Sequence, residues 1–143
     1  MATFVAVTAS NCPRLKDAVA AQAVLDRFVL DGDVTAVIRT DDDADPPYLA
    51  IYGCDWPSAR KIPEDVDRER FEPDYNLDGG EGFEEFLKAI AAHLLEPLNV
   101  QACGYENCRF PISVCEWHVR PGANKIEING FKHSRDEPSP ASC

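Results

Sequence analysis

The chain has 143 residues, of which 45% are apolar, and this length and composition suit one globular domain with a continuous core. No window approaches the roughly 18 apolar residues that span a bilayer, and the N-terminus lacks the basic start and apolar run of a signal peptide. The net charge of −11 argues against direct nucleic-acid binding, which needs clustered Lys and Arg. We therefore expect a soluble, cytoplasmic protein that binds neither nucleic acid nor membranes.

The first part of the chain predicts a strand, a helix and a hairpin. Residues 3–9 are β-branched and apolar without alternation, which is typical of a strand covered on both faces. Residues 13–30 carry apolar side chains at helical spacing and predict an amphipathic helix. The runs 34–40 and 48–54 predict two strands, and the acidic, proline-rich residues between them predict an exposed hairpin connection.

A long acidic loop is expected next, at about residues 55–82. It holds three prolines and ends near Gly79-Gly80, a composition that disfavours regular structure. Unstructured connections of this length are uncommon in compact domains and are usually functional or disordered. Because the loop also contains aromatic residues, we expect it to fold back on the domain.

The remaining elements are a second helix and three strands. Apolar residues from Phe83 to Leu94 recur at helical spacing, and Pro97 ends this helix. The strands are expected at residues 99–105, 112–120 and 125–131, with a turn at 121–124 joining the last two as a hairpin.

The predicted fold class is α+β, with one domain over residues 1–132 and a flexible tail at 133–143. The element order is β-α-β-β, the acidic loop, then α-β-β-β. We expect a mixed or antiparallel sheet of about six strands with both helices packed on one face.

Acidic residues are concentrated in one part of the chain. Residues 41–85 hold 15 of the 25 Asp and Glu but only four of the 14 Lys and Arg, and therefore carry −11, whereas the rest of the chain is neutral. A localised negative field steers cationic partners, although a solubilising loop would have the same composition. If the segment binds a protein, its carboxylates and aromatic side chains are the candidate contacts. These are Asp41, Asp42, Asp43, Asp45, Trp56, Glu64, Asp65, Asp67, Phe71 and Tyr75.

A second candidate site lies on the strand expected at 112–120. Glu116 and His118 are two residues apart and would share one strand face, where a carboxylate could orient an imidazole for acid–base chemistry. Polar residues on an exposed sheet face give the same pattern. The pair is therefore the basis of an alternative function, that of an enzyme or a small-ligand-binding module.

The six cysteines are expected to be free thiols, since the chain is long enough to fold without disulfides. Cys103, Cys108, Cys115 and His118 have the ligand types that zinc prefers, but their spacing fits no zinc motif. In a regular strand Cys115 and His118 would also point to opposite faces. A zinc site is the minor alternative, and no cofactor is expected.

Nucleophile, phosphate-binding and dinucleotide-binding motifs are absent from the sequence. Together with the charge distribution, this favours a small, acidic, non-enzymatic binding protein that docks on a basic surface of a partner protein. One such surface is a site that normally holds nucleic acid, which the protein would occupy as an inhibitor.

Overall fold

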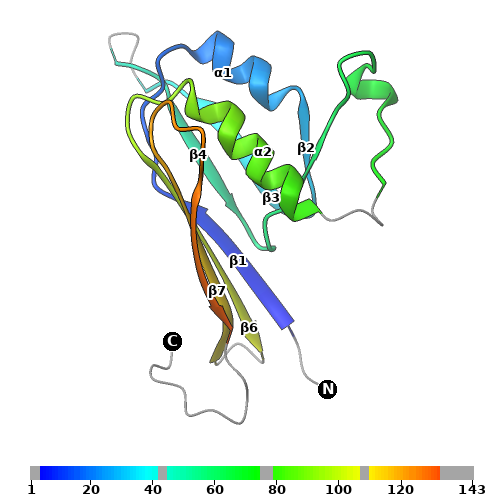
Figure 1. Ribbon diagram of the computed structural model, residues 1–143, viewed down its shortest axis with the longest axis vertical. Coiled ribbons are helices and arrows are strands. Elements are labelled where there is room, and N and C mark those ends of the chain that lie inside the picture. The colour runs from blue at the N-terminus through cyan, green and yellow to red at the C-terminus, as the bar shows by residue number, and fades with distance from the viewer. Residues whose placement is uncertain (1–3, 42–44, 75–78, 107–109, 133–143) are drawn as a thin grey trace.

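The computed structural model describes residues 4–41, 45–74, 79–106 and 110–132. Its main sheet has six strands in the order β3-β4-β1-β6-β7-β8, and every neighbouring pair is antiparallel. The helices α1 (Ala18–Leu25) and α2 (Gly79–Ala91) cover one face (Figure 1). The strands are β1 (Phe4–Ser10), β3 (Val34–Arg39), β4 (Tyr48–Gly53), β6 (Leu98–Glu106), β7 (Phe110–Val119) and β8 (Glu127–Lys132). The α+β prediction is confirmed, and the sheet is antiparallel.

A small second sheet replaces parts of the expected first helix and acidic loop. It pairs β2 (Phe28–Leu30) with β5 (Ala59–Lys61) in antiparallel register. The helix expected over 13–30 is therefore wrong at both ends. At its start, Arg14 and Leu15 instead form β-bridges to Tyr48 and Leu94. The expected loop also contains β5 and the 3₁₀ helix η1 (Arg68–Arg70), and α2 begins three residues before the loop's predicted end.

The core lies between the helices and the covered face of the sheet. α2 places Phe83, Phe86, Leu87 and Ile90 in it, all at most 1% exposed, which is the predicted apolar stripe. The ring of Phe83 packs edge-on against Trp117 of β7, with centroids 5.3 Å apart.

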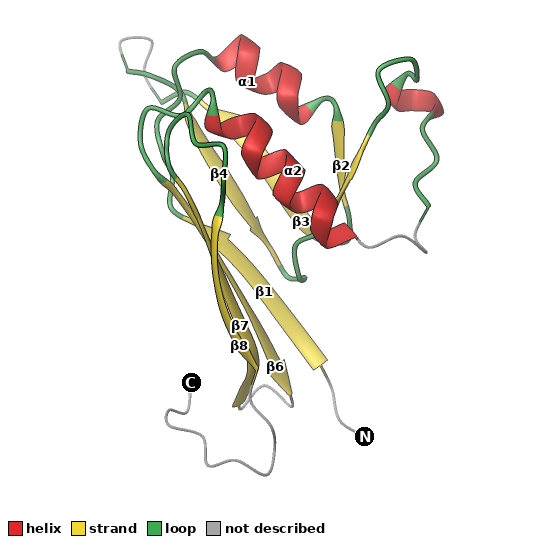
Figure 2. Cartoon of the chain, viewed as in Figure 1, coloured by secondary structure: helices red, strands yellow, loops and turns green. Residues whose placement is uncertain are grey.

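The opposite face of the sheet has no helix on it within the described residues, and β1, β6 and β7 extend beyond the helices (Figure 2). Exposed side chains on this open face include Val7 and Tyr52. Side chains alternate along each strand, so the residues next to buried Val100 and Trp117 point to the open face. Asn99, Gln101, Glu116 and His118 are these residues.

The turn between β7 and β8 forms as predicted. Gly122 has φ of 72°, a left-handed conformation that glycine adopts without a side-chain clash. Its N–H donates to the carbonyl oxygen of Ala91, the last residue of α2, at 2.8 Å. The hairpin therefore also satisfies one carbonyl at the end of the helix.

Candidate functional site

The acidic part of the chain is divided between two places in the fold. Asp41 and Asp45 flank the connection from β3 to β4, and both are exposed. Glu64, Asp65 and Asp67 lie on the chain between β5 and α2, which we call the η1 segment, residues 63–74. Asp42, Asp43 and Tyr75 lie outside the described residues.

The two acidic places lie at opposite ends of α2 (Figure 1). The β3–β4 connection is near the end of the helix, because Arg14 donates to Pro46 O at 2.8 Å and accepts from Leu95 N at 2.8 Å. The η1 segment is near its start, since Asp74 O accepts from Arg60, whose guanidinium lies beside Gly79. A helix of 13 residues is about 20 Å long, so the candidate carboxylates do not form one patch.

Tyr48 orders the β3–β4 connection. Its hydroxyl donates to Asp41 Oδ1 at 3.2 Å, and the Arg14 guanidinium lies over its ring, 5.3 Å from the centroid. Partial desolvation and the neighbouring Asp41 carboxylate raise the pKa of Tyr48. Asp41 is therefore partly engaged within the protein.

The carboxylates of the η1 segment make fewer contacts than the carboxylate of Asp41 does. Glu64, Asp65, Asp67, Glu69 and Glu72 are exposed, and none of them has a side-chain hydrogen bond or ion pair to any residue that the structure describes. A carboxylate in water keeps its charge and is free to pair with a cation from another molecule. These five side chains therefore place accessible negative charge along the η1 segment.

Two arginines attach the η1 segment to the corner between α1 and β2. One belongs to the corner and the other to the segment. From the corner, Arg27 donates to the carbonyl oxygens of Ile62, Pro63 and Val66. From the segment, Arg68 Nη1 donates to Leu25 O at 3.1 Å and to Phe28 O at 2.8 Å. Leu25 ends α1, so Arg68 also satisfies a carbonyl at a helix end.

Arg60 makes a third connection at the start of α2. Its Nε pairs with Asp31 Oδ2 at 3.0 Å, where both side chains are mostly buried, and its Nη1 donates to Asp74 O at 3.2 Å. Ser58 also donates to Asp31 Oδ2, at 2.6 Å. The positive charges of Arg60 and Arg68 thus face the protein itself, while the carboxylates of the segment face solvent.

Two of the aromatic candidates, Trp56 and Phe71, are half-buried in the structure. Trp56 is half-buried against the core, and its ring contacts that of Trp117 with centroids 6.2 Å apart. Phe71 is half-buried on the η1 segment. Trp56 therefore has a packing role at the edge of the core.

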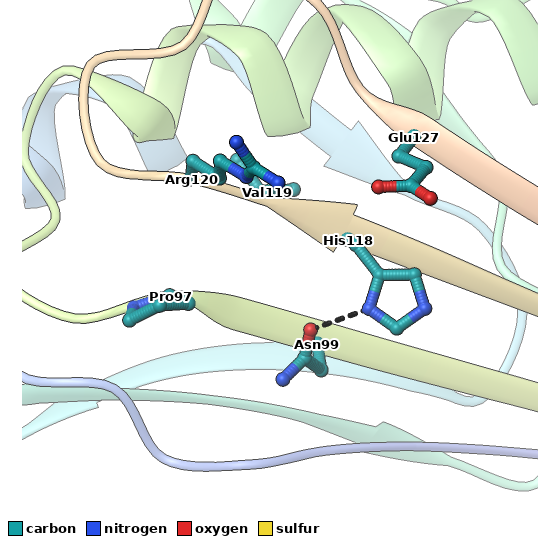
Figure 3. A pocket seen from close by; sticks show the side chains of 6 residues that line it. All are labelled: Pro97, Asn99, His118, Val119, Arg120 and Glu127. Carbon is teal, nitrogen blue, oxygen red and sulfur yellow. Dashed lines mark hydrogen bonds between the residues drawn. The ribbon is translucent and has the colours of Figure 1, made fainter.

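Glu116 and His118 lie side by side on the open face, as predicted, and belong to a polar ladder across β6 and β7. His118 Nε2 is 3.3 Å from Glu116 Oε2, and His118 Nδ1 is 2.7 Å from Asn99 Oδ1 (Figure 3). The register places Asn99 directly opposite His118, and Gln101 opposite Glu116. Gln101 Nε2 is 3.5 Å from Glu116 Oε1.

Acid–base chemistry at His118 would require one of its two contacts to change. Both ring nitrogens of His118 face oxygen atoms, so both contacts are hydrogen bonds only when each nitrogen carries a proton. A general base needs one nitrogen with a free lone pair directed at the substrate. To act as one, His118 would therefore have to release Asn99 or Glu116.

Two shallow hollows flank the ladder. One, of about 380 Å³, is lined by Gln101, Glu116 and His118 among others. The other, of about 310 Å³, shares Asn99 and His118 and also includes Arg120 and Glu127 (Figure 3). Their open walls combine polar and apolar surface in similar amounts.

The structure does not assemble the zinc candidates. Cys103 is opposite Val114 and Cys115 is opposite Ala102, so the two thiols point to different faces of the sheet. Cys108 lies outside the described residues, and no cluster of three metal-ligating side chains occurs among those that are described. Burial raises the pKa of the Cys115 thiol, and a hydrogen bond to the backbone of Glu116 offsets part of this rise.

Sequence reasoning missed Arg27, Arg68 and Asn99. The arginines bind backbone carbonyls, which every residue carries, so no sequence pattern marks their partners. Asn99 is identified only by its register opposite His118. An asparagine and a glutamine alternating with apolar residues in 98–102 were the available signal for the polar ladder.

No helix within residues 4–41, 45–74, 79–106 and 110–132 is long and apolar enough to cross a membrane. Comparison of the chain with protein-family models, curated proteins and solved structures gave no match in any of the three.

Proposed function

We propose that this chain is a small, acidic, non-enzymatic binding protein that docks on a basic surface of a partner protein. The observation that carries the proposal is the group of exposed carboxylates on the η1 segment, which pair with none of the residues that the structure describes. The arginines Arg27 and Arg68 fix the backbone of this segment from the side of the protein, which leaves its carboxylates directed at solvent.

Preorganisation makes this surface suitable for binding. A segment that is already ordered loses less conformational entropy on association than a flexible acidic loop would. Its negative field would also accelerate the encounter with a cationic partner. A basic surface that normally binds nucleic acid presents the complementary charge, so a protein docked there would act as an inhibitor.

The test is to neutralise the carboxylates of the two acidic places in separate variants. Host proteins enriched by cation exchange are captured on the immobilised protein, and the affinity of the captured partner is then measured at several salt concentrations. Neutralising Glu64, Asp65 and Asp67 as Gln, Asn and Asn should weaken binding by roughly 3- to 100-fold, if each exposed pair contributes about 0.2–1 kcal/mol. The salt dependence should flatten in parallel.

The matched control neutralises Asp41 and Asp45, which lie at the other end of α2. It should leave the affinity within about twofold, because charges beyond a Debye length of roughly 8–10 Å are screened. Unchanged affinity and salt dependence in the η1 variant would refute this use of the segment, and a large loss in the control would move the interface to the β3–β4 connection.

A second candidate function is a small-ligand-binding module on the open face. The supporting observation is the hollow lined by both Glu116 and His118. Titration with a panel of small polar metabolites, followed by amide chemical shifts, should perturb Asn99, Gln101 and His118 together. If no compound in the panel perturbs them at millimolar concentration, this candidate is dropped.

A further inference from the structure

The η1 segment is attached to the fold mainly by side-chain hydrogen bonds. None of its residues 63–74 is buried, and only Val66, Phe71 and Pro73 are half-buried. By contrast, Ile62 just before it is 0% exposed and Gly79 at the start of α2 is buried. The apolar core therefore holds the flanks of the segment far more strongly than the segment itself.

Backbone hydrogen bonds of the segment are local. Val66 N donates to Pro63 O, Arg70 N to Asp67 O, and Phe71 N to Arg68 O. Among the described residues, no backbone–backbone hydrogen bond joins residues 63–73 to another part of the chain. Its amides are thus protected by turns that depend on the conformation of the segment as a whole.

Arg60 donates to Asp74 O at the end of the segment, and two further arginine contacts hold the rest of it from opposite sides. Arg27 reaches from the α1–β2 corner to Pro63 and Val66, and Arg68, two residues after Val66, reaches back to the same corner. Because η1 begins at Arg68, both contacts act on the same short stretch of chain, and breaking either one loosens the conformation that holds the other. Hydrogen bonds to charged donors are stronger than neutral ones, so each contact carries a large share of the attachment.

We propose that the η1 segment is a strap that detaches as one cooperative unit while the six-stranded sheet remains folded. Local opening of this kind is expected where apolar contacts are few and the attachment is polar. The strap carries the carboxylates proposed above for docking, but its opening does not depend on any partner. The inference can therefore fail or hold independently of the proposed function.

Amide hydrogen exchange followed by NMR on the full chain tests the strap. Arg27→Met and Arg68→Met each keep an apolar stem but remove the guanidinium. Either substitution should raise the exchange rates of Val66, Arg70 and Phe71 together, by roughly 10- to 100-fold. Amides of β1 and β6 should keep their rates.

Arg70→Met is the matched control. It removes a guanidinium from the same segment, and this one has no hydrogen bond or ion pair to the described residues. Its exchange rates should stay within about threefold of the parent, which is within the usual range for surface substitutions. If Arg27→Met affects only Val66 and Arg68→Met only Arg70 and Phe71, the two halves open separately and the cooperative strap is refuted.

A measurement on the unmodified protein covers the case in which a variant fails to fold. Exchange is measured at increasing, sub-denaturing concentrations of guanidinium chloride. A strap predicts that the η1 amides exchange through an opening with a small denaturant dependence, well below that of the sheet amides. If both groups show the same denaturant dependence and the same opening free energy, the segment opens only on global unfolding, and the inference is wrong.

Discussion

Replacing Gly82 with alanine tests the contact between α2 and β5, which places the start of the helix and the η1 segment. In an exposed helix interior, glycine to alanine stabilises by up to about 1 kcal/mol. Here an added Cβ would lie 1.9 Å from the carbonyl oxygen of Ala59 in β5. This is a clash with backbone, so α2 and β5 would have to separate.

Overpacking of this kind costs about 1–3 kcal/mol, and more where the backbone must shift. Because this clash is with backbone, the upper part of that range applies, about 2–3 kcal/mol, and subtracting a helix-propensity gain of about 1 kcal/mol leaves a net destabilisation of about 1–2 kcal/mol. For a chain of this size, that corresponds to a melting temperature roughly 3–10 °C lower. The sign is therefore opposite to the one that helix propensity alone predicts.

Thermal and urea unfolding, followed by circular dichroism, measure the effect. Glu85→Ala serves as the control, because Glu85 is exposed on the same helix and its replacement should change stability by less than about 0.5 kcal/mol. A Gly82→Ala variant as stable as the parent, or more stable, would show that α2 does not approach β5 so closely. The position of the η1 segment relative to the helix would then need revision.

Three smaller predictions follow from single contacts. Thr8→Val should destabilise by about 1–2 kcal/mol in urea unfolding, because the buried hydroxyl donates to Asp55 O at 2.6 Å and its loss leaves that carbonyl without this partner. Asp17→Ala should cost about 1 kcal/mol in the same assay, since Asp17 caps α1 by accepting from Val19 N; an unchanged midpoint would contradict the cap. In single-cysteine variants, Cys115 should react with iodoacetamide at pH 8 more slowly than exposed Cys54, because its raised pKa leaves less thiolate. The difference between the two rates should become smaller as the pH rises, and equal rates at pH 8 would refute the prediction.

Most of the six-stranded sheet could be predicted from sequence because its signals are local. Each strand was expected within two residues of its observed limits, from apolar or alternating runs bounded by turn residues. The small sheet could not be predicted in this way. Phe28–Leu30 continues the helical spacing of the preceding residues, and Ala59–Lys61 has only one apolar residue, so both become strands through their pairing with each other.

The candidate site was predictable in composition but not in position. Counting charges identified the acidic part of the chain, but sequence order alone placed Asp41 beside Glu64 on one surface, whereas the fold puts them at opposite ends of α2. The exposure of the η1 carboxylates also depends on where Arg68 points. Its partners are the carbonyl oxygens of residues 43 and 40 positions earlier in the chain, and tertiary packing determines that these are the ones within reach.

The central position of β1 bears on how the chain reaches its fold during synthesis. One neighbour of this strand is β4, and along its other edge Phe4 is paired with Glu106, so β1 is completed by a strand that is synthesised about a hundred residues later. Pairings this distant in sequence slow folding and leave apolar strand edges exposed in the meantime. A nascent chain stalled before β6 should therefore hold β1 unpaired on that side.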